Sequence, residues 1–330
     1  MTLLSIDGFE AGDYVARYAT TTSMVRSTTT RFGSGFSLSQ QNGYWMHGLP
    51  APTTKLTVGF VFYYPAANNG DLVTFLADAN TVQHCVFAVT SVGAVVLKRN
   101  GVILATSAAS LVLPATWNYL EFTGSIHDTT GYMSARVNGT EIISFTGDTR
   151  NNGTSMLTDT VRFLPCGINQ VNFWDDMYIL NDLGPAPYNA PLGDCRVQTL
   201  VPTGAGSTTQ LTPVGSASNW DNVDEFPPSM TDYNFSSTPG QRDLYTMSDL
   251  VLGTTTILGV AANSSALKND AGSRSIINTV KTGGTVFGGG ARALSTAQQT
   301  QTGIWQVNPD TGVAWTPAEV NAIEAGVEVV

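Results

Sequence analysis

Charged side chains are scarce in this chain of 330 residues. Asp, Glu, Lys and Arg supply 12% of the sequence, about half the share that is usual in soluble domains. Long solvent-exposed helices draw on Glu, Lys and Arg, so the sequence is poor material for a helical protein. Hydrophobic residues make up 42%, which argues against wholesale disorder. The composition favours short strands joined by tight turns.

Basic residues are the scarcer of the two signs, with 15 Lys and Arg against 25 Asp and Glu and a formal net charge of -10. No run of even four basic residues occurs. Proteins that bind nucleic acid neutralise phosphates with clustered Lys and Arg. We therefore expect no nucleic-acid partner.

Long apolar runs are also lacking. A stretch such as Val58 to Pro65 is far too short to span a bilayer, which takes about 20 apolar residues. The opening MTLLSIDGFEAGD has no basic segment, and Asp7 and Glu10 interrupt its apolar part, unlike a secretory signal peptide. The expectation is a protein made and folded in a cytoplasm, with no signal peptide and no membrane insertion.

Cysteine and histidine are rare, with three of each. Three widely separated cysteines, Cys85, Cys166 and Cys195, fit reduced thiols better than a disulfide framework. His84 and Cys85 are adjacent, and adjacent residues of a strand point to opposite faces. They are therefore expected neither to chelate one metal ion nor to pair as a nucleophile and its base.

Asn-Gly pairs are frequent and mark hairpins, because both residues readily take the positive φ that a type I′ turn needs. The five pairs are Asn42-Gly43, Asn69-Gly70, Asn100-Gly101, Asn138-Gly139 and Asn152-Gly153. Two of them lie between convincing strands. The third pair separates residues 95–99 from 102–105, and the fourth separates 131–137 from 140–145.

Strict alternation of apolar residues marks a further strand at 55–64, where one face carries Leu56, Val58, Phe60, Phe62 and Tyr64. More strands are expected at 117–124, 161–164 and 171–180. Many short strands with regular turns, and no alternating helices, indicate an antiparallel sandwich. The expected fold class is all-β.

A proline-rich segment divides the sequence. Residues 181–193 read NDLGPAPYNAPLG, and prolines end sheet structure because each removes a backbone donor. We therefore expect a sandwich domain at 1–183, a stiff linker at 184–193 and a second β-rich domain at 194–330. In the second domain, strands are expected at 195–201, 244–247, 254–262, 274–281 and 303–307, with a loop region up to about residue 224.

One short helix is expected near the end of the chain. Thr316 is a good N-cap, Pro317 suits the first helical position, and Glu319 completes a capping box. Gly326 is expected to end the helix. Residues 327–330 then form a short terminal strand.

Six segments of the first domain occur in a characteristic order. They are DGF at 7–9, GFSL at 35–38, LTVGFVF at 56–62, WNYLEF at 117–122, RVNGTEI at 136–142 and FWDDMYIL at 173–180. Their order and spacing resemble the laminin-G-like, concanavalin A-like family. This resemblance implies an antiparallel jelly-roll sandwich for residues 1–183.

A second resemblance covers nearly the whole chain. The opening IDGFE, the segment GDCRVQTLVPTGAG at 193–206 and the closing NPDTGVAWTPAEVNAIEAGVEVV together resemble structural proteins of tailed bacteriophages. The resemblance implies a non-enzymatic virion protein that is tail-associated, as a fibre, tip or receptor-contacting component. The alternatives are a capsid decoration or head-fibre protein and a stand-alone lectin-like module. Other virion proteins, further copies of this chain in a homo-oligomer and host-surface glycans are the partners expected.

Asp175 and Asp176, which follow Trp174, form the best local acidic feature. In laminin-G-like relatives calcium sites lie at loop edges of the sandwich, and carboxylate oxygens suit calcium. The pair is therefore the candidate metal site, and no other cofactor is expected. In the alternative, one Asp caps backbone donors and the other is solvated, since alternation directs them to opposite sides of the strand.

Catalytic clusters are lacking. Retaining glycosidases place two carboxyl groups about 5 Å apart, and glucanases of this fold carry Glu-x-Asp-x-x-Glu or a near variant, which is missing here. Glu121 and Glu141 are isolated on separate expected strands. The glycine-rich residues 282–290 lack a nucleotide-binding order and indicate a hairpin with bulges. We expect no enzymatic activity.

Aromatic residues in expected loops give the candidate ligand contacts. Tyr44, Trp45, Trp220 and Tyr233 could stack on sugar rings or contact a protein partner. Most aromatic residues of this kind serve as core or intersubunit contacts instead.

Overall fold

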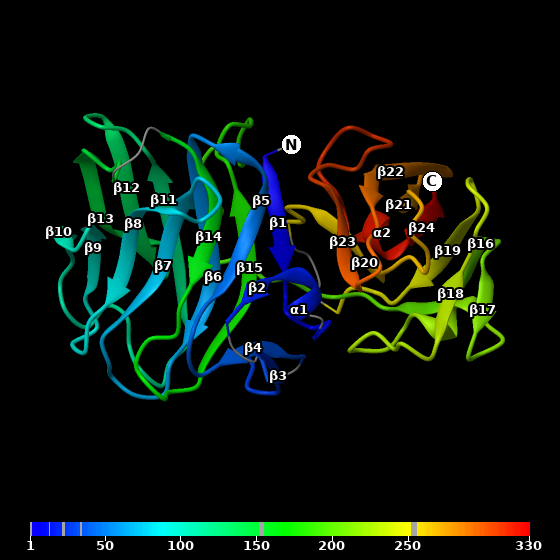
Figure 1. Cartoon of the computed structure of the whole chain (residues 1–330), viewed down its shortest axis with the longest axis horizontal. Helices are drawn as coiled ribbons and strands as arrows, with labels where there is room; N and C mark the ends of the chain where they lie inside the picture. Colours follow the sequence, from blue (N-terminus) through cyan, green and yellow to red (C-terminus); the bar gives the residue numbers. More distant parts are fainter. Residues whose placement is uncertain (1, 13, 22–23, 34, 152–154, 252–255) are drawn as a thin grey trace. The chain divides into compact units, whose positions relative to one another are not determined.

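The computed structural model (Figure 1) describes residues 2–12, 14–21, 24–33, 35–151, 155–251 and 256–330. Strands dominate it and helices are short, which confirms the all-β prediction. The chain divides into two compact units. Unit 1 contains Met1–Glu10 and Tyr18–Val197, and unit 2 contains Ala11–Arg17 and Gln198–Val330. Within the described ranges, no helix is long and apolar enough to cross a membrane.

Unit 1 is a sandwich of two antiparallel sheets. In the order of their pairing, the strands of the first sheet are β13 (Thr140–Gly147), β12 (Gly131–Val137), β11 (Asn118–Ser125), β6 (Lys55–Tyr63), β15 (Asn172–Leu180), β4 (Ser37–Gln40) and β3 (Val25–Ser27), and β1 (Leu3–Asp7) also pairs with β15. Those of the second sheet are β10 (Val102–Thr106), β9 (Val95–Arg99), β8 (Val82–Val89), β7 (Gly70–Ala77), β14 (Thr158–Phe163), β5 (Trp45–Thr53) and β2 (Ala19–Thr20).

Aromatic side chains from both sheets meet in the core of unit 1. Phe122 of β11 stacks on Phe87 of β8 with ring centroids 4.5 Å apart, and Phe60 of β6 meets Phe163 of β14 edge-on at 5.6 Å. The alternation seen in the sequence of β6 thus directs one face of that strand into the core. Burying a Phe side chain contributes about 1.5–3 kcal/mol, so these rings stabilise the sandwich strongly.

The proline-rich segment packs on the first sheet instead of forming a spacer. The backbone N–H of Leu192 donates to Tyr178 Oη at 2.9 Å, and that of Gly193 donates to Glu121 Oε1 at 2.8 Å. Tyr178 lies over Gly59, where a Cβ would come within 2.1 Å of its ring. The boundary therefore lies at Val197, later than the predicted linker at 184–193, which belongs to unit 1.

Unit 2 contains one larger sheet and two ribbons. The sheet runs β16 (Pro202–Thr209), β19 (Arg242–Met247), β24 (Glu324–Val329), β21 (Ser275–Thr282) and β22 (Thr285–Ala293). The ribbons pair β17 (Thr212–Val214) with β18 (Tyr233–Phe235), and β20 (Val260–Ala266) with β23 (Gln299–Trp305). The short helix α1 (Tyr14–Arg17) contacts β23, and the 3-10 helix η1 (Asn219–Asn222) contacts β16 and both strands of the first ribbon.

Several predicted strand positions in this unit are wrong. Residues 195–201 are not a strand, and β16 and β17 lie inside the predicted loop region. β16 has the sequence PTGAGSTT and, within the described ranges, pairs with β19 alone, so small polar residues suffice at this edge. Of the strand predicted at 254–262, residues 260–262 belong to β20, and residues 254 and 255 lie outside the described ranges. The predicted Asn152-Gly153 turn also lies outside them. Residues 282–290 form the predicted hairpin.

The predicted helix is confirmed, as α2 (Pro317–Asn321). Thr316 Oγ1 accepts from the N–H of Glu319 at 3.2 Å, and Glu319 Oε2 accepts from the N–H of Thr316 at 2.7 Å. The helix ends at Asn321 without Gly326, which corrects the predicted stop. Gly326 lies in β24 instead, where a Cβ would be 1.9 Å from the carbonyl oxygen of Asp243.

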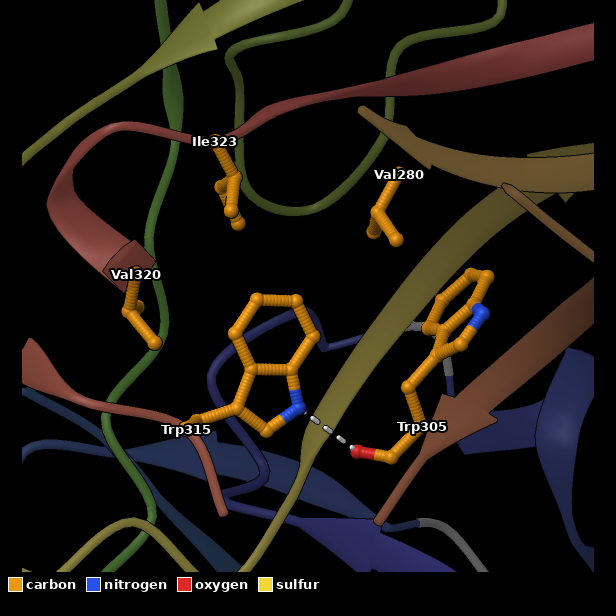
Figure 2. Packing of buried hydrophobic residues seen from close by; sticks show 5 residues of the cluster. All are labelled: Val280, Trp305, Trp315, Val320 and Ile323. Atoms are coloured by element: carbon orange, nitrogen blue, oxygen red, sulfur yellow. Dashed lines mark hydrogen bonds between the residues drawn. The ribbon is translucent and has the colours of Figure 1, made fainter. Parts of the chain in front are cut away.

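The hydrophobic core of unit 2 gathers around two tryptophans (Figure 2). Val280, Trp305, Trp315, Val320 and Ile323 form the buried cluster. Trp315 Nε1 donates to the carbonyl oxygen of Trp305 at 3.1 Å, so its buried indole N–H is satisfied. α2 therefore folds against a core that the strands complete.

Two glycines let β22 approach β23 closely. A Cβ built on Gly289 would lie 2.6 Å from the Cα of Gly303, well inside normal contact distance. A Cβ on Gly303 would be less crowded, at 3.0 Å from Trp305 Cη2 and 3.2 Å from the Cα of Gly289. Backbone contact at this point thus requires glycine, above all at position 289.

Candidate functional site

Three loops of unit 1 border a shallow, open hollow of about 320 Å³. The loops precede β5, precede β7 and follow β14. Phe163 at the end of β14 pairs with both Trp45 and Val73, so the register brings the three loops to one end of the sandwich. The lining residues are Asn42, Gly43, Asn69, Gly70, Asp71, Leu164, Pro165, Gly167 and Ile168.

Asparagine side chains brace these loops. Asn42 Oδ1 accepts from the N–H of Asn169 at 3.2 Å, and Gln41 Nε2 donates to the carbonyl oxygen of Asn169 at 3.0 Å. Asn69 Oδ1 accepts from the N–H of Ser91 at 2.7 Å. The hollow is therefore held open by hydrogen bonds within the protein before any ligand arrives, which lowers the cost of ordering on binding.

Glycine makes room inside the hollow. A Cβ on Gly70 would lie 2.9 Å from the Cα of Cys166. Gly167 has a φ of 91°, and a Cβ there would lie 2.3 Å from Asn68 Nδ2. Larger residues at either position would push the loops apart or fill the space between them.

Charged groups border the hollow on the outer side of the second sheet. Lys98 Nζ forms an ion pair with Asp71 Oδ1. Arg162 Nη2 donates to Gln83 Oε1, and the guanidinium lies 5.4 Å from the ring centroid of Tyr44. Asp71 is the only one of these residues that lines the hollow itself.

The structure separates the neighbours Tyr44 and Trp45, which were both predicted to contact glycan. Tyr44 follows the lining residue Gly43 and is partly exposed. Trp45 is fully buried, with its ring stacked 3.9 Å from that of Phe163. Because Trp45 begins β5 and points into the core, its prediction as a ligand contact is wrong.

The other two predicted aromatics lie in unit 2. Trp220 belongs to η1 and is partly buried, whereas Tyr233 in β18 is 45% exposed. Phe235, two residues further along β18, is 49% exposed on the same face. The predicted glycan contacts therefore do not form one site, and sequence reasoning missed Phe235 although the alternation of β18 places it beside Tyr233.

The predicted metal pair lies in a buried acidic cluster, which consists of Asp7, Glu10, Asp175 and Asp176. Asp175 and Asp176 depart from simple alternation, because β15 has an irregularity after Asp175 and Asp176 has a φ of 51°. Asp176 Oδ1 accepts from the N–H of Val197 at 2.7 Å, and Asp175 Oδ1 accepts from the N–H of Asp176 at 2.8 Å. Asp176 Oδ2 is buried and finds no hydrogen-bond partner among the residues that the structure describes.

Burial raises the pKa of Glu10 from 4.5 to about 7, and the charges of Asp176 and Asp7 add to this. The pKa values of Asp175 and Asp176 are raised as well, chiefly by burial and, for Asp175, by the charge of Asp176. A raised carboxyl pKa means that the folded state binds the proton more tightly than the unfolded state. These carboxyl groups therefore stabilise the folded state at acid pH. Their contribution to stability is lost as the pH rises from their pKa values in the unfolded chain through the raised pKa values of the folded state.

Among the described residues, no group of three or more His, Cys, Asp or Glu side chains has an arrangement that could hold a metal ion. Asp175 and Asp176 thus lack a third acidic ligand in suitable geometry. Calcium binding at this pair stays a prediction.

Glu121 and Glu141 lie on either side of Arg136 in one row of the first sheet. Two strand spacings separate their backbones by about 9–10 Å. Glu121 is 1% exposed and accepts from Tyr178 and Gly193, whereas Glu141 lies 3.8 Å from the Arg136 guanidinium. A ligand therefore cannot reach both carboxylates.

The residues that build the hollow were largely missed by sequence reasoning. Asn42-Gly43 and Asn69-Gly70 were recognised as turns, yet the pairing of β14 with both β5 and β7 is what brings these turns together. The 164–168 segment carries no signal of its own in the sequence. Recurrent asparagine at loop positions was the available hint.

No family model matches the chain, and neither does any curated protein sequence. Solved structures resemble it in part. A protein of unknown function with a galectin-like fold from Bacillus subtilis is 12% identical, with a TM-score of 0.41 over 55% of this chain and 96% of that one. A sialidase is 11% identical, with a TM-score of 0.40 over 54% of this chain and 18% of the sialidase.

A carbohydrate-binding module, CBM66 of Bacillus subtilis, is 7% identical, with a TM-score of 0.33 over 50% of this chain and 96% of the module. The chain thus covers only a small part of the sialidase but nearly all of the two smaller proteins. Similarity at these scores transfers no function. The sandwich itself is established by the strand pairing of unit 1.

Proposed function

We propose that unit 1 is a glycan-binding module and that the chain acts by binding and not by turnover. The observation that carries this proposal is the braced hollow formed by the loops before β5, before β7 and after β14. Concave sites with a few fixed polar groups beside apolar surface are the usual form of small-ligand sites.

The lining of the hollow matches the chemistry of a sugar. Hydroxyl groups both donate and accept hydrogen bonds, and the carboxylate of Asp71 and the side-chain amide of Asn69, whose Oδ1 also accepts from Ser91, offer acceptors and donors that complement them. Sugar rings also present C–H faces, which suit the apolar side chain of Ile168, a lining residue that is 84% exposed. Tyr44 follows the lining residue Gly43 in the chain, and its ring is the aromatic contact that we propose for a bound sugar.

Binding without turnover is supported by the carboxylates of unit 1. Glu121 is buried beneath residues 192–193, and Asp175 and Asp176 are buried in the acidic cluster. Asp71, the carboxylate that does line the hollow, is paired with Lys98. A single ion-paired carboxylate does not provide the acid and base that glycoside hydrolysis requires.

The test is to apply the purified chain to an array of oligosaccharides and to measure the affinity for each positive sugar by calorimetry. Ile168→Ala is expected to weaken binding several-fold, because it removes exposed apolar surface from the hollow. Ile103→Ala is the matched control, since Ile103 is 60% exposed on β10 and does not line the hollow. Failure to bind any sugar, or equal loss in both variants, would contradict the proposal.

For the setting we propose the virion of a tailed bacteriophage. The support is the resemblance carried by the segments at 6–10, 193–206 and 308–330. A glycan-binding module on the tail would serve attachment to the host surface. Labelling intact particles with an antibody to this chain should decorate the tail; decoration of the head would favour the capsid alternative, and unlabelled particles would refute the virion setting.

A further inference from the structure

The charges that line the hollow restrict its ligand further. Asp71 is the one ionised side chain in the lining, which contains no Lys or Arg. The remaining groups are amides, glycines and apolar side chains. An anionic sugar bound in the hollow would thus meet a carboxylate and no opposing cation among the lining residues.

The pairing of Asp71 decides what it can offer a ligand. Lys98 Nζ donates to Oδ1, and within the described part of the chain this is the hydrogen bond that the carboxylate accepts. The side chain remains 41% exposed, so Oδ2 is available to accept hydrogen bonds from outside. Hydrogen bonds to an ionised acceptor are about twice as strong as neutral ones, and sugar hydroxyls are suitable donors whereas a sugar carboxylate is not.

Lys98 does not provide an unengaged counter-charge for an acidic sugar. Its ammonium group is already engaged with Oδ1. Arg162 lies outside the lining and is held by Gln83 and by the ring of Tyr44. Both cations are therefore committed to contacts within the protein.

We infer that the hollow binds neutral glycans and discriminates against carboxylated ones, with Asp71 as the residue that determines this specificity. The inference rests on the proposed glycan-binding function of unit 1. It assigns Asp71 two roles: acceptor for the hydroxyl groups of a neutral sugar, and repulsive element against the carboxylate of a uronic or sialic acid.

The experiment compares matched pairs of oligosaccharides, each a neutral sugar and its carboxylated counterpart, at physiological salt. A galactose-terminated sugar with its sialylated form and a mannose oligomer with a mannuronate oligomer are suitable probes. For the unmodified chain we expect measurable binding of the neutral member and several-fold weaker binding of the acidic member, because the carboxylate of the acidic sugar would approach that of Asp71.

The Asp71→Asn variant sharpens the test. It should weaken neutral binding about tenfold, because a charged acceptor is lost. It should also strengthen acidic binding relative to neutral, because Lys98 is released from its partner. Asp148→Asn is the matched control: Asp148 is exposed and paired with Arg99 as Asp71 is with Lys98, but it does not line the hollow.

The outcomes distinguish the inferred specificity for neutral sugars from the proposed glycan-binding function. Preferential binding of acidic sugars that is lost in Ile168→Ala would overturn the specificity inference and leave the glycan-binding function standing. An unchanged preference in Asp71→Asn would also overturn it. Absence of binding to every probe would refute both. A thermal melt of each variant checks that folding is retained, which the exposure of Asp71 leads us to expect.

Discussion

Replacing Trp45 with alanine should strongly lower the stability of unit 1, whereas replacing its neighbour Tyr44 with alanine should lower it little. The indole of Trp45 is fully buried and stacked on Phe163 at 3.9 Å with an interplanar angle of 9°. It also meets Trp174 edge-on, with centroids 6.3 Å apart. Truncation of a buried Trp costs about 3–5 kcal/mol because a cavity remains. For a domain of this size that corresponds to a fall in Tm of roughly 6–20 °C.

Tyr44→Ala removes a partly exposed ring that lies against the Arg162 guanidinium. A cation–π contact at an exposed site contributes about 0.5–1 kcal/mol. Calorimetric melts of both variants, with glycan binding measured in parallel, give the comparison. We expect a large loss of stability only in Trp45→Ala and a loss of affinity without unfolding in Tyr44→Ala. A Trp45→Ala protein that melts normally but fails to bind sugar would refute the placement of this residue in the core.

Three further predictions concern packing, charge and capping. Gly289→Ala should lower the stability of unit 2 by about 1–3 kcal/mol, because its Cβ would lie 2.6 Å from the Cα of Gly303; Gly48→Ala, where the space is open, should leave the melt unchanged or slightly higher. The acidic cluster ionises between about pH 5 and 8 because its pKa values are raised, so we expect the stability to fall as the pH rises through this range. Asp175→Asn should make this fall smaller. A calcium-dependent rise in Tm at pH 8 would support the metal site predicted at Asp175 and Asp176, and a profile that calcium leaves unchanged would count against that site. Thr316→Ala should cost about 1 kcal/mol in a denaturant titration, since the capping box is lost; a change below the error of the titration would contradict the assigned cap.

Turns and helix caps could be predicted from the sequence wherever neighbouring residues determine the conformation. The Asn100-Gly101 and Asn138-Gly139 turns, with positive φ at all four residues, and the capping box at Thr316 depend on contacts within a few positions. The same reasoning failed at β16, whose PTGAGSTT has no apolar alternation because it pairs at a sheet edge. Edge pairing depends on a partner strand that is distant in the sequence.

The candidate site was less predictable than the fold for the same reason. Trp45 and Tyr44 are adjacent aromatics, and only the pairing of β5 with β14 decides which of them points inward. The lining of the hollow comes from three segments more than twenty residues apart, and their approach is a property of strand order. The proline-rich segment gave a correct signal for the end of the sheet but no information about the surface on which it packs.

The assignment of Ala11–Arg17 to unit 2 has a consequence for the inheritance and engineering of this protein. The chain passes from one unit to the other after Glu10, after Arg17 and after Val197. Modules joined by one linker can be exchanged by a single recombination event, but here a cut at residue 197 would strip unit 2 of α1, which contacts β23. We therefore expect the two units to be inherited together, and an isolated unit 2 to keep its α1 contact only if residues 11–17 are supplied with it.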